Sequence, residues 1–167
     1  MTSSLDSVAD LAGLVTLRPV NETDLDFLVG VYGSTREEEL SQVVWADGQR
    51  EAFVRMQFGA QDADYRATNP HGAFDVIEVA GSPAGRLYVD RRPGDIRIVD
   101  IALLPEFRGK GVGAHLIGRL MREASASGCK LSIHVEVHNR AAALYDRLGF
   151  AVVAEQGVYR RMEWVAS

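Results

Sequence analysis

The sequence lacks several features that define specialised classes of protein. It has a single cysteine, Cys129, so no intramolecular disulfide is possible. No apolar run approaches the roughly 20 residues that cross a bilayer. The opening segment MTSSLDSVADLAGL has neither the basic start nor the continuous apolar stretch of a secretory signal. We therefore expect a cytoplasmic protein with no membrane attachment, and a flexible leader over residues 1–13.

The sequence also has fewer basic than acidic residues. The chain has 18 lysines and arginines against 23 aspartates and glutamates, a formal net charge of −5. Such a chain has no global basic field, so we expect no nucleic-acid partner. A length of 167 residues, of which 47% are hydrophobic, suits one soluble domain with one core. No repeat, low-complexity tract or linker divides the chain, and we expect a single domain over residues 14–167.

Periodicity and turn signals predict an alternating order of helices and strands. The predicted strands cover residues 14–20, three segments within 72–105, 130–137, 150–155 and 158–165. The predicted helices begin near residues 21–23, 34–37, 47, 111 and 139. Asn21 or Thr23 is expected to cap the first helix, and Ser34 or Thr35 the second. This order predicts an α/β (α+β) fold, with a mixed, mostly antiparallel sheet of about seven strands and helices on both faces.

One predicted strand, DIRIVDIALL, changes its pattern part of the way along. Its apolar positions shift parity after Ile98, and a β-bulge at Ile98–Val99 would restore one continuous apolar face. The bulge would also gather Arg97, Asp100 and Ala102 on the opposite face. The alternative is a fully buried strand in which Asp100 is a structural carboxylate paired with Arg97.

The segment FRGKGVG combines cations and glycines just before an amphipathic helix. The first N–H groups of a helix have no internal partner, and the helix dipole adds partial positive charge there. Glycines let a ligand approach the backbone, and Arg108 and Lys110 add attraction for anions. The segment therefore predicts a phosphate site, most simply one for a diphosphate.

The segment matches neither of two known phosphate-binding motifs in full. The Walker A pattern fails, because Leu104 occupies its first glycine position. The dinucleotide fingerprint is formally met by Gly109, Gly111 and Ala114, but it comes after four predicted strands instead of at the first strand–helix turn. A dinucleotide enzyme and a glycine-rich loop without a ligand remain as alternatives.

Two motifs carry a resemblance to a known family. RGKGVG resembles the R/Q-x-x-G-x-G/A signature of the GNAT superfamily of N-acetyltransferases, and NRAAALYDRLGF resembles its second signature. The resemblance covers about residues 14–165. It implies a transfer of acetyl from acetyl-CoA to a primary amine, by direct attack in a ternary complex and with no metal. The alternative within this resemblance is a regulatory or degenerate domain that binds coenzyme A without turnover.

The resemblance also implies which residues hold coenzyme A. The diphosphate would rest on the glycine-rich loop, and the pantetheine arm would pair with the strand before it, in a gap beside strand 130–137. The implied contacts are Ile101, Ala102, Leu103, Arg108, Gly109, Lys110, Gly111, Val112, Gly113, Ala114, Asn139 and Tyr145. The spacing from Asn139 to Tyr145 is one residue shorter than usual, so an N-cap is an alternative role for Asn139.

Catalytic roles follow from the same resemblance. Tyr145 matches a tyrosine that protonates the leaving thiolate, and its alternative is a core tyrosine. Asp100 is the first candidate for the base that takes the amine proton. His134 and Glu136 are the next candidates, because they share one face of the neighbouring strand, and His134 titrates in the right range.

The acceptor side of the site is less specific. Phe53, Gln57, Gln61 and Tyr65 form one helical stripe at a spacing of four, which predicts either a polar pocket wall or a hydrogen-bonded structural face. Tyr32 and Arg36 are further candidates, and Tyr159 could reach the same cleft. We expect the partner to be a small-molecule amine or a peptide amine, and relatives of this type also form homodimers.

Overall fold

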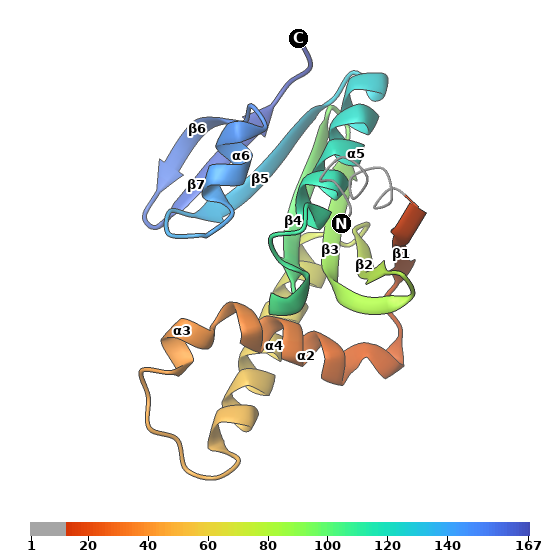
Figure 1. The fold of residues 1–167 in the computed structure, drawn as a ribbon. Coiled ribbons are helices and arrows are strands. Elements are labelled where there is room, and N and C mark those ends of the chain that lie inside the picture. The colour runs from red at the N-terminus through yellow and green to blue at the C-terminus, as the bar shows by residue number, and fades with distance from the viewer. Residues whose placement is uncertain (1–12) are drawn as a thin grey trace, which may run out of the picture.

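The computed structural model describes residues 13–167 and contains one seven-stranded sheet (Figure 1). The strand order is β1-β2-β3-β4-β5-β7-β6, and every neighbouring pair is antiparallel except β4 and β5. The strands are β1 (Val15–Pro19), β2 (Ala73–Val79), β3 (Ser82–Arg92), β4 (Asp95–Leu103), β5 (Lys130–Glu136), β6 (Ala151–Gln156) and β7 (Tyr159–Trp164). This confirms the predicted fold class and the predicted number of strands.

Helices cover both faces of the sheet. The α-helices are α2 (Leu25–Thr35), α3 (Glu37–Leu40), α4 (Gln49–Thr68), α5 (Val112–Ser127) and α6 (Ala142–Arg147), with 3₁₀ turns at Glu22–Asp24 (η1) and Pro105–Phe107 (η2). No helix within residues 13–167 combines the length and apolar composition needed to cross a membrane. The predicted leader lies almost wholly outside the described residues.

Capping explains where the first helices begin. The Asn21 side chain accepts from the Thr23 N–H at 2.9 Å, and the Asp24 carboxylate accepts from the Asn21 N–H at 2.8 Å. The expected cap at Asn21 is therefore present, at the start of η1. The expected cap by Ser34 or Thr35 was wrong. α2 continues through both residues, so their hydroxyls donate back to carbonyls one turn earlier, and Arg36 precedes α3 instead.

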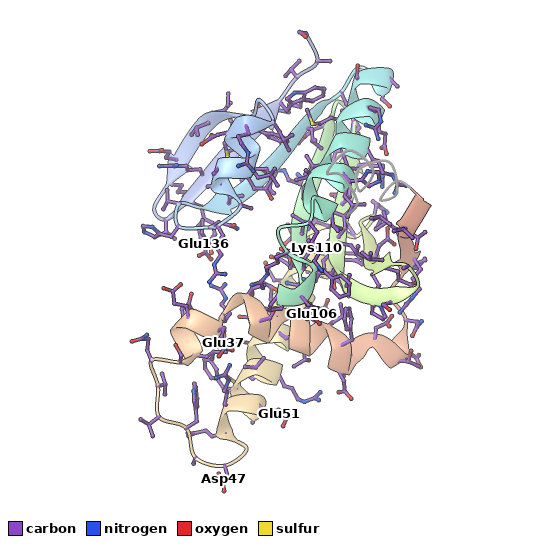
Figure 2. All side chains as sticks on the ribbon, in the orientation of Figure 1. Glu37, Asp47, Glu51, Glu106, Lys110 and Glu136 are labelled. Atoms are coloured by element: carbon purple, nitrogen blue, oxygen red, sulfur yellow. The ribbon has the colours of Figure 1, made fainter. Side chains whose placement is uncertain are left out.

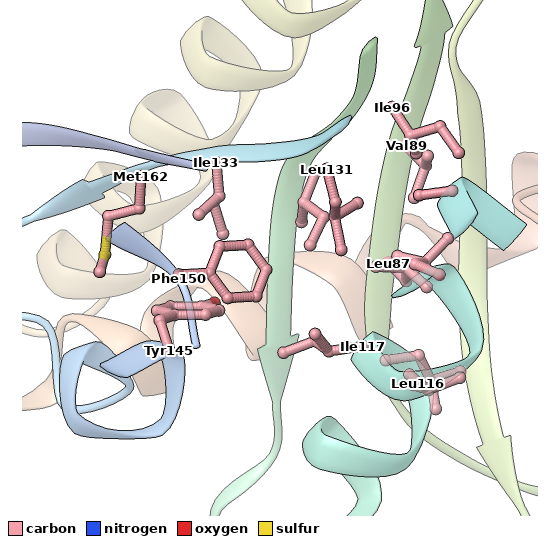
Figure 3. Packing of buried hydrophobic residues seen from close by; sticks show 14 of the residues in the cluster. Leu87, Val89, Ile96, Leu116, Ile117, Leu131, Ile133, Tyr145, Phe150 and Met162 are labelled. Atoms are coloured by element: carbon pink, nitrogen blue, oxygen red, sulfur yellow. The ribbon is translucent and has the colours of Figure 1, made fainter. Parts of the chain in front are cut away.

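Two apolar cores lie on opposite faces of the sheet. The larger core packs α5 and α6 against the sheet and includes Leu87, Leu116 and Tyr145 (Figure 3). The smaller core joins α2, α3 and α4 through residues such as Tyr32 and Phe58. Alternating residues of β3 face the two layers, which is the period-2 pattern of a sheet covered on both sides.

The predicted bulge is confirmed in β4. Tyr88 pairs with Asp100 and Val89 pairs with Ile98, so Val99 is the extra residue of the bulged strand. The parallel pairing of β4 with β5 covers only Asp95–Ile98 and stops at the bulge. Beyond it, β5 continues alongside β7, and the strands β5, β7 and β6 diverge from the rest of the sheet (Figure 1). The C-terminal part of β4, residues 99–103, is therefore left without a neighbour on one side.

Candidate active site

The glycine-rich loop leads directly into α5. Gly109 and Gly111 have φ angles of 71° and 82°, in the left-handed region that favours glycine. Gly111 precedes the helix as its N-cap and supplies no side-chain cap. The loop can turn this tightly only because residues without a Cβ occupy these two positions.

Arg108 fixes the loop to the rest of the fold. Its Nε donates to the Leu103 carbonyl at 2.9 Å, and its Nη2 lies 3.2 Å from the Ser34 hydroxyl on α2. The Arg108 backbone N–H donates to the Pro105 carbonyl at 3.2 Å. Both its side chain and its N–H therefore have partners within the fold, and its role here is to position the loop between β4 and α2.

The N–H groups after Arg108 are free to bind a ligand. Among the described residues, none of the turn, loop and cap hydrogen bonds has an N–H of Gly109 to Ala114 as its donor. The N–H groups at the start of α5 also lack partners within the helix, and its dipole favours an anion there. Lys110 is exposed on this loop (Figure 2). This row of donors suits a diphosphate, so the residues present fit the phosphate end of coenzyme A.

The free edge of β4 faces the space that β5 leaves. The Leu104 N–H donates to the Ala84 carbonyl at 2.8 Å, on the β3 side. Because backbone groups point alternately to the two sides of a strand, the N–H groups of Leu103 and Ile101 point away from β3. Ala102 lies between them and pairs with Arg86 on β3. The strand thus offers donors to an extended ligand lying in the gap.

Tyr145 lies on the opposite side of the same gap. Its ring is 1% exposed and meets Phe150 edge to face at a centroid distance of 5.6 Å (Figure 3). Burial raises the pKa of its hydroxyl, and the negative charge of Asp100 raises it further. Tyr145 is therefore both a core residue and a protonated phenol beside the gap, and the two roles are compatible.

Asp100 pairs with a residue that the sequence analysis did not single out. The Asp100 carboxylate forms an ion pair with Arg86 on β3, not with Arg97, so the expected alternative partner was wrong. The Arg86 side chain is only 2% exposed and also donates to Gln61 at 2.7 Å. Arg97 donates instead to Ser132 at 2.7 Å. The bulge decides the partner, because it places Asp100 opposite Tyr88 and beside Arg86 on the α4 face.

Arg86 is the main functional candidate that sequence reasoning missed. An arginine at an alternating strand position is normally taken for a solvent-facing residue. Here it is buried, with the Tyr88 ring centroid 5.2 Å and the Phe58 centroid 5.8 Å from its guanidinium carbon. The register of the β3–β4 hairpin, with the bulge included, places Arg86 close to Asp100. This register is the feature of the sequence from which the pair could have been predicted.

The other base candidates lie at the far end of β5. His134 is exposed, and its pKa is lowered by partial burial and by nearby arginines, Arg97 first among them. Glu136 lies 3.5 Å from Arg36, which links β5 to the end of α2. Figure 2 shows Glu136 at the end of β5, on the side toward α3. The Asn139 side chain accepts from the Ala141 N–H at 2.7 Å in the turn before α6, but the N-cap of α6 is Ala141 and not Asn139.

A cavity of about 460 Å³ opens between the helices of the N-terminal half and the ends of β5 and β7. Five of its lining residues were expected at the acceptor site: Tyr32, Arg36, Phe53, Gln57 and Tyr159. Glu136 lines the same cavity. The structure thus brings together residues from α2, α4, β5 and β7 that lie up to 127 positions apart in the sequence, from Tyr32 to Tyr159.

Gln61 and Tyr65 do not line this cavity, although they continue the stripe of Gln57. Gln61 accepts from Arg86, and the Tyr65 ring meets Tyr88 edge to face at 6.2 Å. The stripe therefore divides into a cavity wall and a hydrogen-bonded support for the buried arginine. Among residues 13–167, no three histidine, cysteine or acidic side chains gather in a way that could hold a metal ion.

The fold agrees with the comparisons to known proteins. The profile of the Acetyltransferase (GNAT) family matches residues 34–150, more than half of the chain, and the chain belongs to this family. Its members are acetyltransferases.

Several solved structures share the fold. The PaiA N-acetyltransferase from Thermoplasma acidophilum, in complex with coenzyme A, is 16% identical with a TM-score of 0.67, over 91% of this chain and 99% of that one. An acetyltransferase from Salmonella typhimurium that modifies the N-terminal serine of ribosomal protein L7/L12 is 16% identical with a TM-score of 0.63, over 92% and 96%. YncA from the same organism, with acetyl-CoA, is 21% identical with a TM-score of 0.55, over 91% and 94%.

Proposed function

We propose that this protein is an acetyl-CoA-dependent N-acetyltransferase that acetylates a primary amine by direct attack in a ternary complex. Acetyl-CoA supplies the activated acyl group, and the amine nitrogen attacks the thioester carbonyl carbon while the C–S bond breaks. Relatives with the same fold have been solved with coenzyme A or acetyl-CoA, which supports this cosubstrate.

The observation that carries the proposal is the row of free N–H groups from Gly109 to Ala114, at the mouth of the gap beside β4. In this proposal they hold the diphosphate, and the pantetheine arm follows the free N–H groups of Ile101 and Leu103. The N–H of Leu103 polarises the acyl carbonyl, as backbone donors do in acyl transfer.

In this proposal, side chains on the two sides of the gap donate a proton to the sulfur and accept one from the amine. Tyr145 gives its proton to the departing sulfur, since its raised pKa keeps the phenol protonated. Asp100, His134 and Glu136 are the proposed routes for the proton that leaves the amine. Glu136 lines the cavity, and Asp100 is paired with Arg86 on the face of the sheet that α4 covers.

A melting experiment with coenzyme A tests the cosubstrate. Millimolar coenzyme A should raise the melting temperature, because a ligand at 100 times its Kd stabilises a fold by about 2.7 kcal/mol. Gly111→Val, which forces a β-branched residue to a φ of 82°, should abolish the shift. Gly30→Ala is the matched control, since a Cβ there meets nothing within 4 Å.

Turnover is tested separately, by release of free thiol from acetyl-CoA with a panel of primary amines. A domain that binds coenzyme A without turnover would show the melting shift but no thiol release with any amine. A protein that is not protected by coenzyme A at all would contradict the proposal.

A further inference from the structure

The acceptor cavity has an apolar, aromatic end formed by the helical layer. The rings of Trp45 and Phe53 are tilted by 37° relative to one another, with centroids 5.3 Å apart. The Trp45 indole N–H donates to the Leu40 carbonyl at 2.9 Å, which fixes the ring. Leu40 and Val54, both nearly fully buried, complete this end of the cavity. No charged side chain from α4 lines it.

The other end of the cavity is charged and includes Glu136, the last residue of β5, the strand that diverges from β4. Arg36 is paired there with two carboxylates, Glu39 at 3.2 Å and Glu136 at 3.5 Å. Its guanidinium carbon also lies 5.8 Å from the centroid of the Tyr32 ring. With one cation and two carboxylates, the charged lining has an excess of one negative charge. A paired arginine offers little to a substrate carboxylate, whereas the excess negative charge favours an ammonium group.

We infer that the acceptor is a small monoamine attached to a compact aromatic group, such as an arylalkylamine. This inference rests on the proposed function and specifies its substrate class. The ammonium end lies at Glu136, close to where the acyl group would arrive, and the ring packs against Trp45 and Phe53. A cavity of about 460 Å³ suits one such molecule, because ligand pockets of this size hold drug-sized molecules.

The same lining disfavours other classes of amine. A polyamine would place a second ammonium against the apolar end, where an unpaired charge is strongly unfavourable. An amino sugar would bury hydroxyl groups with few partners there. An aromatic amino acid would bring its carboxylate into a region with a net negative charge, against which the paired Arg36 gives little compensation.

The test compares matched amines in the thiol-release assay with the full chain and acetyl-CoA. Phenethylamine should have a kcat/KM at least about ten times that of ethylamine, which has the same amine without the ring, and of spermidine, glucosamine and phenylalanine. A short peptide with an N-terminal serine should also react at least about ten times more slowly. A preference for any of these over phenethylamine would overturn the inference.

Variants locate the preference in the cavity. Trp45→Ala and Phe53→Ala should each raise the KM for phenethylamine about ten-fold, a loss of about 1.4 kcal/mol, and leave the KM for acetyl-CoA unchanged. Val44→Ala is the matched control, because Val44 adjoins Trp45 but is 98% exposed and lies outside the cavity lining. The melting temperature of each variant without ligand reports whether it folds.

The outcomes separate the two proposals. If phenethylamine reacts but neither variant changes its KM, or if spermidine reacts best, the inference fails while the acetyltransferase activity stands. If coenzyme A binds but no amine releases thiol, both the activity and the acceptor class are wrong.

Discussion

In the proposed mechanism, Tyr145 serves both the core and the chemistry. Its ring belongs to the larger core and packs against Phe150, while burial raises the pKa of its hydroxyl above the ordinary value. A general acid acts in its protonated form, so a raised pKa extends the active form toward higher pH. The packing that holds the ring thus also keeps the proton on it.

Tyr145→Phe should lower kcat about 100-fold, because it removes the proton donor and keeps the ring. The melting temperature and the affinity for coenzyme A should stay close to those of the parent protein. In the parent, the raised pKa predicts that kcat does not fall through loss of this proton between about pH 7 and pH 10. Thiol release measured across this range checks the kcat of the variant and the pH dependence of the parent. An unchanged kcat in Tyr145→Phe would show that Tyr145 is not the proton donor.

The ion pair of Arg86 and Asp100 connects β3 to β4 on the face that α4 covers. Removal of one partner of such a pair leaves an uncompensated charge, whereas removal of both does not. Arg86→Met should therefore lower the free energy of unfolding by about 3–5 kcal/mol, measured by denaturant titration. The double variant Arg86→Met/Asp100→Asn should recover much of that loss.

An exposed arginine gives the control for this pair. Arg55 pairs with Asp26 on the surface, and Arg55→Met should have no measurable effect on unfolding. Equal effects of the two arginine variants, or no recovery in the double variant, would show that the loss of stability does not come from an uncompensated charge on Asp100.

At the scale of elements, the approach of β3 to β4 depends on one residue without a side chain. A Cβ at Gly85 would collide with the Ala102 carbonyl and would lie 2.9 Å from the Leu103 Cα. Gly85 pairs with Leu103, at the end of the edge that faces the gap. The shape of this edge therefore depends on the absence of a side chain on the neighbouring strand.

Gly85→Ala should displace the end of β4, with a loss of stability of about 1–3 kcal/mol from overpacking. Because the displaced segment carries the Leu103 N–H, the affinity for coenzyme A should also fall, as calorimetry can measure. Gly30→Ala in α2, which has open space for a Cβ, should instead raise stability by up to about 1 kcal/mol. If Gly85→Ala binds coenzyme A as tightly as the parent protein, the end of β4 does not contribute to the cofactor site.

At the scale of the whole molecule, the sheet is divided by the bulge at Val99. On one side of the gap, β1 to β4 form a continuous antiparallel sheet, and on the other, β5, β7 and β6 carry α6 and Tyr145. The ion pair of Arg36 with Glu136 connects the helical layer to this second part. The gap and the acceptor cavity both exist because these parts diverge.

Amide hydrogen exchange should reveal this division. Coenzyme A should increase protection at Ile101, Leu103 and the loop 109–114, whose N–H groups lack partners in the free protein. Val76, in the interior strand β2, should exchange at the same slow rate with and without the ligand. NMR exchange rates in the two states provide the measurement, and a uniform change across the sheet would contradict a ligand seated in the gap.

The sequence predicted the loop and the bulge because both depend on local patterns. A glycine-rich segment directly before an amphipathic helix leaves backbone N–H groups without partners, whatever the rest of the fold is. The parity shift after Ile98 determines the bulge in the same way. The cap at Asn21 was local too, whereas the cap expected at Ser34 or Thr35 failed because α2 ran on through these residues.

The partners of buried and cavity residues could not be predicted in this way. Gln57 and Gln61 belong to the same stripe of α4, yet Gln57 lines the cavity and Gln61 accepts a hydrogen bond from Arg86. Which role each takes depends on β3, β5 and β7, and so on contacts between segments that lie far apart in the chain.

The sequence by itself determined the order of the elements, the family signatures and the glycine-rich start of α5 with its free N–H groups, since these follow from periodicity, turn residues and helix polarity. Only the tertiary structure decided that Asp100 pairs with a buried Arg86, that Arg36 bridges to Glu136, and that Trp45 and Phe53 line one cavity with them. The physical reason is that burial and charge pairing are set by strand register and by the divergence of the sheet, which no single segment encodes.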